Sequence, residues 1–179
     1  MTKKTNIVLL GFMGSGKTVI GRQAARLLDF DFADVDEEIR QVTGMDLPKL
    51  YRKHGEIRCR SEERLLVGKL AQRERTVIAC GGSLPPEEDN LRLLAERGWF
   101  VLLTAQPEVI RGRLSRKRDR LLVSGRVTPE LIGRQANDWE ASYAGFADCR
   151  VDSGRLGVDE AAEAIVAAWQ DYLAASQGK

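Results

Sequence analysis

The stretch GFMGSGKT, residues 11–18, follows a short apolar run and precedes a segment with helical periodicity. It matches the pattern G-x-x-x-x-G-K-[ST], whose fixed positions are Gly11, Gly16, Lys17 and Thr18. Glycines let backbone N–H groups point together at an anion, and the N-terminus of the following helix attracts the same charge. A glycine-rich turn without a ligand is the alternative, but the strand–loop–helix context favours phosphate binding. We call this stretch the phosphate loop, and it predicts a site for a nucleoside triphosphate.

Short apolar runs alternate with amphipathic stretches along the rest of the chain. Five runs predict buried strands because they show little alternation of polar and apolar residues; they cover residues 6–10, 30–34, 76–80, 99–104 and 149–153. Helical periodicity is clearest over residues 18–28, 36–44, 47–55, 60–74 and 158–173. Strands interleaved with helices indicate a parallel sheet covered on both faces. We therefore expect one three-layer α/β/α domain over residues 1–179.

Composition and charge are ordinary for a globular domain of 179 residues. The net charge is only +2, and the basic run at residues 111–126 lacks the aromatic side chains of a nucleic-acid platform. Three separate cysteines (Cys59, Cys80 and Cys149) and one histidine argue against a disulfide framework or structural zinc. No segment has the length of a signal peptide or a membrane span. We expect a cytoplasmic monomer without a nucleic-acid or membrane partner.

The second predicted strand ends in D-V-D, with acids at Asp34 and Asp36. The carboxyl ends of parallel strands border the crevice where such sheets bind ligands, and alternation along an extended end would put both acids on one side. One acid could support a metal ion, and the other could accept a proton from an attacking hydroxyl. Alternatively, Asp36, Glu37 and Glu38 could be acids favoured at a helix start by the helix dipole. The sequence has no N-K-x-D motif for guanine and no acid-ended third strand, which favours a small-molecule kinase over a GTPase switch or a motor ATPase.

Four motifs occur in a specific order and spacing: GFMGSGKT, DVDEEIRQVTG, HGEIRCRSEE and CGG. Together they resemble the shikimate kinase family, small P-loop kinases with a fold like that of nucleoside-monophosphate kinases. The resemblance covers nearly the whole chain. It implies a P-loop NTP hydrolase fold with a five-stranded parallel sheet in the order 2-3-1-4-5. It also implies a helical substrate-binding region at about residues 34–64 and a mobile lid at about residues 112–126.

The resemblance implies roles for residues that follow the second and third strands. Asp34 would hold Mg²⁺ through water alongside Thr18, and Asp36 would bind the ring hydroxyls of shikimate and act as the base. Arg60 would clamp the substrate carboxylate, with Glu63 orienting it.

Two glycines after the third strand, Gly81 and Gly82, would offer backbone N–H groups to the substrate. Without the resemblance, Arg60 and Glu63 would be interpreted as a surface pair on an exposed helix.

The resemblance also implies an ATP site that joins the phosphate loop to the lid. Lys17 and Arg120 would stabilise charge on the transferring phosphoryl group, with Arg118 as the alternative lid arginine. The residues expected at ATP are Gly11, Gly14, Ser15, Gly16, Lys17, Thr18, Val19 and Arg120. A solvated charged segment is the alternative for most of residues 111–126.

Three positions depart from the family pattern. Ser83 stands in place of a third glycine, and the lid has D-R-L-L at residues 119–122 instead of R-P-L-L. Trp139, in the phrase WEASY, occupies the position of a second substrate arginine. Losing one charge-assisted bond should weaken acid binding by about 1.5–3 kcal/mol. Two questions stay open: whether Arg134 takes the place of the missing arginine, and whether Trp139 belongs to the core.

The sequence thus predicts an enzyme that uses ATP and Mg²⁺ to phosphorylate the 3-hydroxyl of shikimate, giving shikimate 3-phosphate and ADP. This reaction belongs to chorismate and aromatic amino-acid biosynthesis. One alternative is a kinase of the same build acting on another small polyhydroxy compound, as Trp139 and Ser83 suggest. Another is a non-catalytic nucleotide-binding switch. Cys59 and Cys80 are predicted to be small buried apolar residues without redox function.

Overall fold

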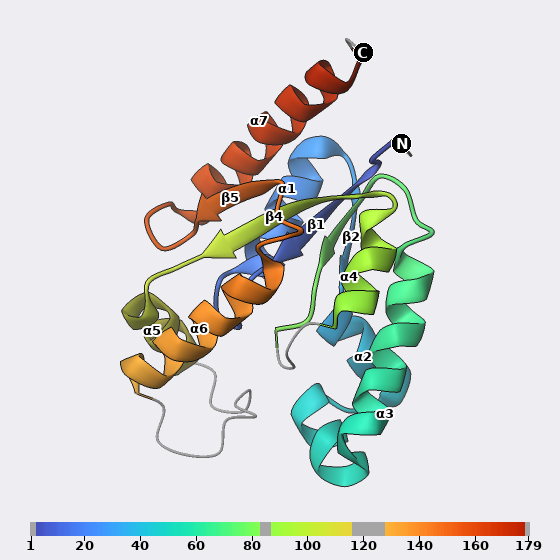
Figure 1. Ribbon diagram of the computed structural model, residues 1–179, viewed down its shortest axis with the longest axis vertical. Coiled ribbons are helices and arrows are strands. Elements are labelled where there is room, and N and C mark those ends of the chain that lie inside the picture. Colours follow the sequence, from blue (N-terminus) through green and yellow to red (C-terminus); the bar gives the residue numbers. More distant parts are fainter. Residues whose placement is uncertain (1–2, 83–86, 116–127, 178–179) are drawn as a thin grey trace.

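The computed structural model describes residues 3–82, 87–115 and 128–177, which form a parallel sheet wrapped by helices (Figure 1). Its strands are β1 (Asn6–Leu10), β2 (Asp31–Asp34), β3 (Thr76–Ala79), β4 (Gly98–Thr104) and β5 (Cys149–Asp152). Every paired strand is parallel, and the spatial order is β2-β3-β1-β4-β5. The five predicted strands and their order are therefore confirmed.

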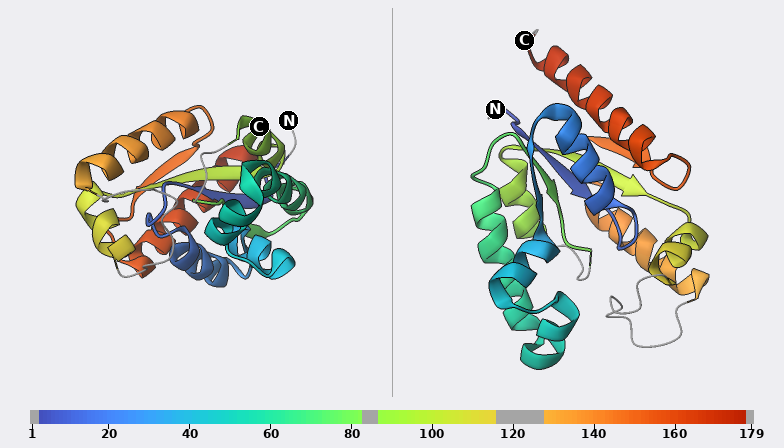
Figure 2. Two further views of the ribbon diagram at one scale, coloured as in Figure 1. Left: turned by 90° about the horizontal axis from the view of Figure 1, so that it is seen from below. Right: turned by 180° about the vertical axis from the view of Figure 1, so that it is seen from behind.

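Helices cover both faces of this sheet. They are α1 (Lys17–Leu28), α2 (Val35–Thr43), α3 (Leu47–Leu70), α4 (Glu88–Ala95), α5 (Pro107–Ser115), α6 (Pro129–Tyr143) and α7 (Val158–Gln177). Figure 2 (left) shows α1 and α7 on one side of the sheet and α6 on the other. In the described part of the chain, no helix is both long and apolar enough to cross a membrane.

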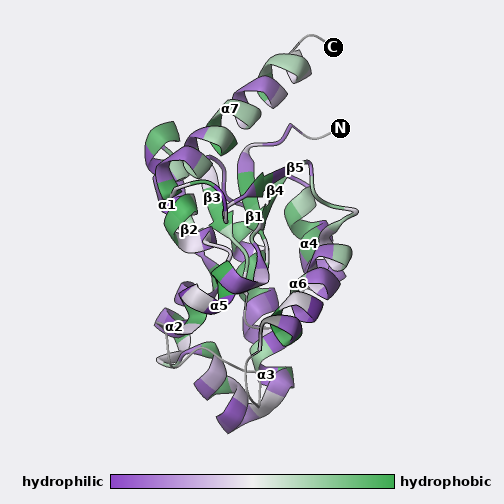
Figure 3. Ribbon diagram, turned by 90° about the vertical axis from the view of Figure 1, so that its left-hand side faces the viewer, coloured by the Kyte–Doolittle hydropathy of each residue, from purple (hydrophilic) through white to green (hydrophobic). Residues whose placement is uncertain are grey.

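The central strand β1 shows why polar and apolar residues do not alternate in the predicted strands. Ile7 and Leu9 pack with α1 and α7, whereas Val8 and Leu10 pack with the helices of the opposite face. All five residues of β1 are buried, and Figure 3 shows hydrophobic residues gathered in the strands. A strand covered on both faces needs apolar residues at every position except where a polar side chain finds partners. Asn6 does so: its Oδ1 accepts from the Thr76 N–H, and its Nδ2 donates to the Arg73 carbonyl.

The element α3 (Leu47–Leu70) consists of two helical segments, because the backbone at Gly55 is not helical: φ is 78° and ψ is 178° there. The prediction of two helices, at residues 47–55 and 60–74, is therefore confirmed, except that the second segment ends earlier, at Leu70. This backbone conformation is almost restricted to glycine, because a Cβ atom would be strained there. The bend lies between the start of α3 and the turn that carries Arg60.

The bend at Gly55 should depend on the missing side chain. Gly55→Ala should lower the free energy of unfolding by about 1–3 kcal/mol, because no atom crowds the position and backbone strain is the main cost. Gly68→Ala in the same helix is the matched control: it also meets no neighbour, and it should gain stability because alanine favours helix. Urea denaturation of both variants measures this contrast, and equal effects would contradict it.

Candidate active site

The parallel sheet brings three chain segments to one edge. Asp34 at the end of β2 is in register with Ala79 of β3, and Ala79 is in register with Leu9 of β1. The phosphate loop follows β1, and Cys80 to Gly82 follow β3. Residues far apart in the sequence, such as Gly11 and Gly82, therefore meet at the carboxyl ends of these strands.

The phosphate loop has the backbone form that its glycines predict. Gly11, Gly14 and Gly16 all have positive φ angles, and a Cβ on Gly11 would lie 2.4 Å from the Leu103 carbonyl oxygen. Lys17 folds back over the loop, where its Nζ donates to the carbonyl of Gly11 at 2.6 Å. The loop thus places an ammonium group and the N-terminus of α1 around one point, as an anion site requires.

Two residues that the sequence analysis missed hold this loop from outside. Arg113 of α5 donates to the Gly14 carbonyl at 3.0 Å and to the Ser153 carbonyl at 2.6 Å. The Ser153 hydroxyl, just after β5, donates to the Ser15 carbonyl at 2.6 Å. Arg113 belongs to the basic run that the sequence analysis singled out, but its charge alone gave no signal for this role.

Thr18 and Asp34 lie together beside the loop. The Thr18 hydroxyl donates to Asp34 Oδ2 at 2.6 Å, and Asp34 is only 8% exposed. A hydroxyl and a carboxylate are the oxygen ligands that Mg²⁺ uses next to nucleotide phosphates. Within the described ranges, no group of three or more histidine, cysteine, aspartate or glutamate residues could form a metal centre. The hydroxyl of Thr18 and the carboxylate of Asp34 are oxygen donors of the kind that would suit Mg²⁺ beside a nucleotide.

The prediction that D-V-D extends the strand end is wrong, because the chain turns into a helix there. The alternative is confirmed: Asp36, Glu37 and Glu38 are acids of the first helical turn. Asp34 Oδ1 accepts from the Asp36 and Glu37 N–H groups at 3.0 and 3.3 Å, which makes Asp34 the N-cap of α2. The helix begins at Val35, so Asp36 lies in its first turn. The two carboxylates therefore share the site because of a helix cap and not because of strand alternation.

The glycine pair at the end of β3 lies between charged side chains. A Cβ on Gly82 would lie 2.9 Å from Lys17 Nζ, and a Cβ on Gly81 would lie 2.8 Å from Asp36 Oδ1. The Gly82 N–H donates to Asp36 Oδ2 at 3.3 Å. The two glycines thus allow the backbone to pass between the ammonium group of Lys17 and the carboxylate of Asp36. That their N–H groups donate hydrogen bonds to a substrate stays a prediction.

Arg60 of α3 has carboxylates on several sides. Its guanidinium lies 3.3 Å from carboxylate oxygens of Glu56, Glu63 and Glu87, the last of which precedes α4. The Arg60 side chain is only 17% exposed, so the arrangement is not the exposed surface pair considered from the sequence. The contact with Glu87 comes from a distant segment, and the sequence gave no signal for it.

Burial changes the protonation of the charged groups at this edge. It lowers the pKa of Lys17, an effect that Asp36 and Asp34 oppose. Burial also raises the pKa of Glu63 to about 7, against the opposing charge of Arg60 and with the help of Asp36 and Glu87. Burial raises the pKa of Cys80 to about 12, which keeps it a thiol and agrees with an apolar role.

Trp139 belongs to the core, which resolves one of the alternatives left by the sequence. It is buried and meets the Phe12 ring edge-to-face, with ring centroids 5.3 Å apart. Arg134 lies exposed on α6 and Val19 is exposed on α1. The other predicted positions, Ser83, Arg118 and Arg120, lie outside the described residues.

Comparisons with known proteins agree with this arrangement. A family model described as shikimate kinase matches residues 13–170. The chain is 44% identical over 161 residues to the shikimate kinase of Pelotomaculum thermopropionicum, covering 90% of this chain and 93% of that protein. It is 35% identical over 164 residues to that of Caldanaerobacter subterraneus subsp. tengcongensis, covering 92% and 95%. A solved structure, shikimate kinase from Acinetobacter baumannii in complex with shikimate, is similar with a TM-score of 0.85 and 30% identity, covering 94% of each chain.

The raised pKa of Glu63 should make stability depend on pH. Between pH 4.5 and about 7 the unfolded chain loses a proton from this carboxyl that the folded protein keeps, so stability falls as pH rises through that window. Glu63→Gln should therefore gain stability relative to the original protein across the window, by at most about 3 kcal/mol. Urea denaturation at pH 4.5 and 7.5 measures the difference. A difference that does not change with pH would contradict the buried-carboxyl assignment.

Proposed function

The chain belongs to the shikimate kinase family, and we propose that it transfers the γ-phosphoryl group of ATP to the 3-hydroxyl of shikimate. The products are shikimate 3-phosphate and ADP, a step in chorismate and aromatic amino-acid biosynthesis. The proposal rests on one observation: Lys17 and Asp36 both lie beside Gly82. A Cβ on Gly82 would lie close to Lys17 Nζ, and the Gly82 N–H donates to the Asp36 carboxylate. A phosphate-binding cation and a base thus lie next to each other, as transfer to an alcohol requires.

The phosphate side of the site would bind ATP. Backbone N–H groups of the phosphate loop and Lys17 would hold the phosphates, and Arg113 would keep the loop in place through its bond to Gly14. Thr18 and Asp34 would hold Mg²⁺, Asp34 through water, in keeping with their mutual hydrogen bond. When bound, Mg²⁺ would neutralise charge on the β- and γ-phosphates.

The acceptor side would bind shikimate and remove its proton. Asp36 would accept the proton of the 3-hydroxyl, and Lys17 beside it would stabilise the charge of the transferring group. Arg60 would bind the shikimate carboxylate, and Glu63 would orient the guanidinium through the contact at 3.3 Å. Gly81 and Gly82 would line the acceptor site through their backbone.

The proposal includes a substrate-binding region and a mobile lid. Residues at about 34–64, which comprise α2 and much of α3, would form the substrate-binding region. Residues at about 112–126 would form the lid, although 112–115 complete α5, where Arg113 is held by Gly14 and Ser153. From the rest, which lies outside the described residues, Arg120 or Arg118 would approach the γ-phosphate and help exclude water. We also propose a monomer that acts in the cytoplasm and needs no nucleic acid.

The acceptor identifies the function most directly. ADP release should require shikimate and should not be stimulated by a panel of other hydroxylated acids and sugars. Asp36→Asn should keep its affinity for ATP but lose about 10²–10⁴-fold in kcat, because the base is removed. Glu37→Gln is the control, since its side chain pairs with Arg22 on the surface. Stimulation by another acceptor and not by shikimate would overturn the proposal, and full turnover of Asp36→Asn would exclude it as the base.

The role of Arg60 is tested by its removal. Arg60→Ala should raise the KM for shikimate about 10- to 100-fold, since a charge-assisted bond to the carboxylate is lost and position 139 offers no second arginine. The KM for ATP should stay within about twofold, as no ATP contact is expected there. Arg58→Ala is the matched control, because Arg58 is an exposed arginine of the same helix that pairs with Glu62. An effect of Arg60→Ala confined to ATP would contradict the assignment.

A further inference from the structure

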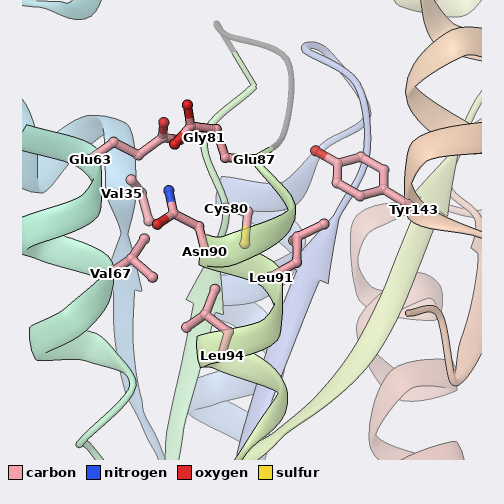
Figure 4. A pocket seen from close by; sticks show the side chains of 10 residues that line it. All are labelled: Val35, Glu63, Val67, Cys80, Gly81, Glu87, Asn90, Leu91, Leu94 and Tyr143. Atoms are coloured by element: carbon pink, nitrogen blue, oxygen red, sulfur yellow. The ribbon is translucent and has the colours of Figure 1, made fainter. Parts of the chain in front are cut away.

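A small cavity extends from the acceptor side of the site into the space between α3 and α4. It has a volume of about 20 Å³, and apolar side chains such as Val67, Leu91 and Leu94 form much of its wall. Glu63 and Glu87, which are two of the acids that contact Arg60, line the same cavity (Figure 4). A space of this size can hold one water molecule if two or more polar groups are available to bond it.

Asn90 of α4 supplies an unusual polar group in this wall. The residue is only 6% exposed, and its amide Nδ2 is buried without a hydrogen-bond partner among the described residues. Figure 4 shows the amide nitrogen directed into the cavity, on the side of Glu63. A buried donor without a partner costs free energy, so the position calls for an acceptor in the cavity.

We propose that Asn90 is a positioning residue for the substrate-carboxylate clamp: its amide binds one water in the cavity, and this water donates a hydrogen bond to Glu63, which holds Arg60. The inference rests on the proposed role of Arg60 in binding shikimate. Asn90 would not touch the substrate itself.

The water would provide an acceptor for the amide of Asn90 and a donor for the carboxylate of Glu63. It accepts from Asn90 Nδ2 and donates one proton to Glu63, and its second proton is available to Glu87 in the same wall. Glu63 in turn contacts Arg60 over 3.3 Å, which is long for a charge-assisted bond, so Arg60 alone leaves its carboxylate weakly held. A second donor fixes the orientation of the carboxylate and hence of the guanidinium.

The surrounding charges make such a donor important. Burial raises the pKa of Glu63, and the carboxylates of Asp36 from α2 and Glu87 before α4 add to the effect, while Arg60 of its own helix opposes it. A water that donates to Glu63 favours its ionised form. Ionised Glu63 is the form that pairs with Arg60.

Replacing the donor tests the inference. Asn90→Leu, which removes the donor and occupies similar space, should raise the KM for shikimate about five- to tenfold, the effect of one lost hydrogen bond. The kcat and the KM for ATP should stay within about twofold, a split that a general loss of folding would not produce. Asn90→Ser, which keeps a donor, should recover part of the KM. Leu93→Ala, on the same helix but outside the cavity wall, should lower the melting temperature without this change in KM.

The outcomes separate this inference from the proposed function. If Asn90→Leu leaves the KM for shikimate unchanged while Arg60→Ala raises it, the inference is wrong and the clamp stands. If Arg60→Ala has no effect on that KM, the proposed clamp itself fails. A crystal structure of the unaltered protein provides a test that needs no variant: a water between Asn90 Nδ2 and the Glu63 carboxylate is expected, and its absence from clear density would overturn the inference.

Discussion

Lys17 and Asp36 both lie against Gly82, at the carboxyl edge of the sheet, and this juxtaposition of charges organises the site. A buried ammonium group needs nearby negative charge or hydrogen-bond acceptors, and Lys17 has both: the carboxylates of Asp36 and Asp34 and the carbonyls of its own loop. Side chains larger than hydrogen at the end of β3 would separate the two charges. The proposed chemistry therefore depends on a place where the chain carries no side chain.

The parts of the structure encoded by local pattern were predictable from the sequence. Strands buried on both faces leave unbroken apolar runs, and these strands were confirmed. The phosphate loop has a fixed glycine spacing, and its backbone has the form that this spacing predicts. The resemblance supplied the strand order, which spacing alone does not determine. The prediction that the D-V-D segment forms an extended strand end was wrong. The side chain of Asp34 caps α2, and the helix begins at the next residue, Val35.

Contacts between distant segments were not predictable. Arg113 bonds a loop residue 99 positions away, and Ser153 bonds one 138 positions away, so no local pattern could reveal either. The same holds for Glu87, which reaches Arg60 only because α4 packs beside α3. Trp139 could be interpreted in two ways until its burial against Phe12 decided between them. Because Trp139 carries no charge, the proposed recognition of a substrate acid would depend on Arg60 and on the carboxylates that hold it.

The contact between Trp139 and Phe12 also gives the protein a built-in optical reporter. Phe12 is a residue of the phosphate loop, so the indole of Trp139 lies directly beside that loop. The remaining tryptophans of the three in the chain, Trp99 and Trp169, pack against each other on the opposite face of the sheet. A ligand that displaces Phe12 should therefore change the fluorescence of Trp139 in real time, without an attached dye and against the background of the other pair.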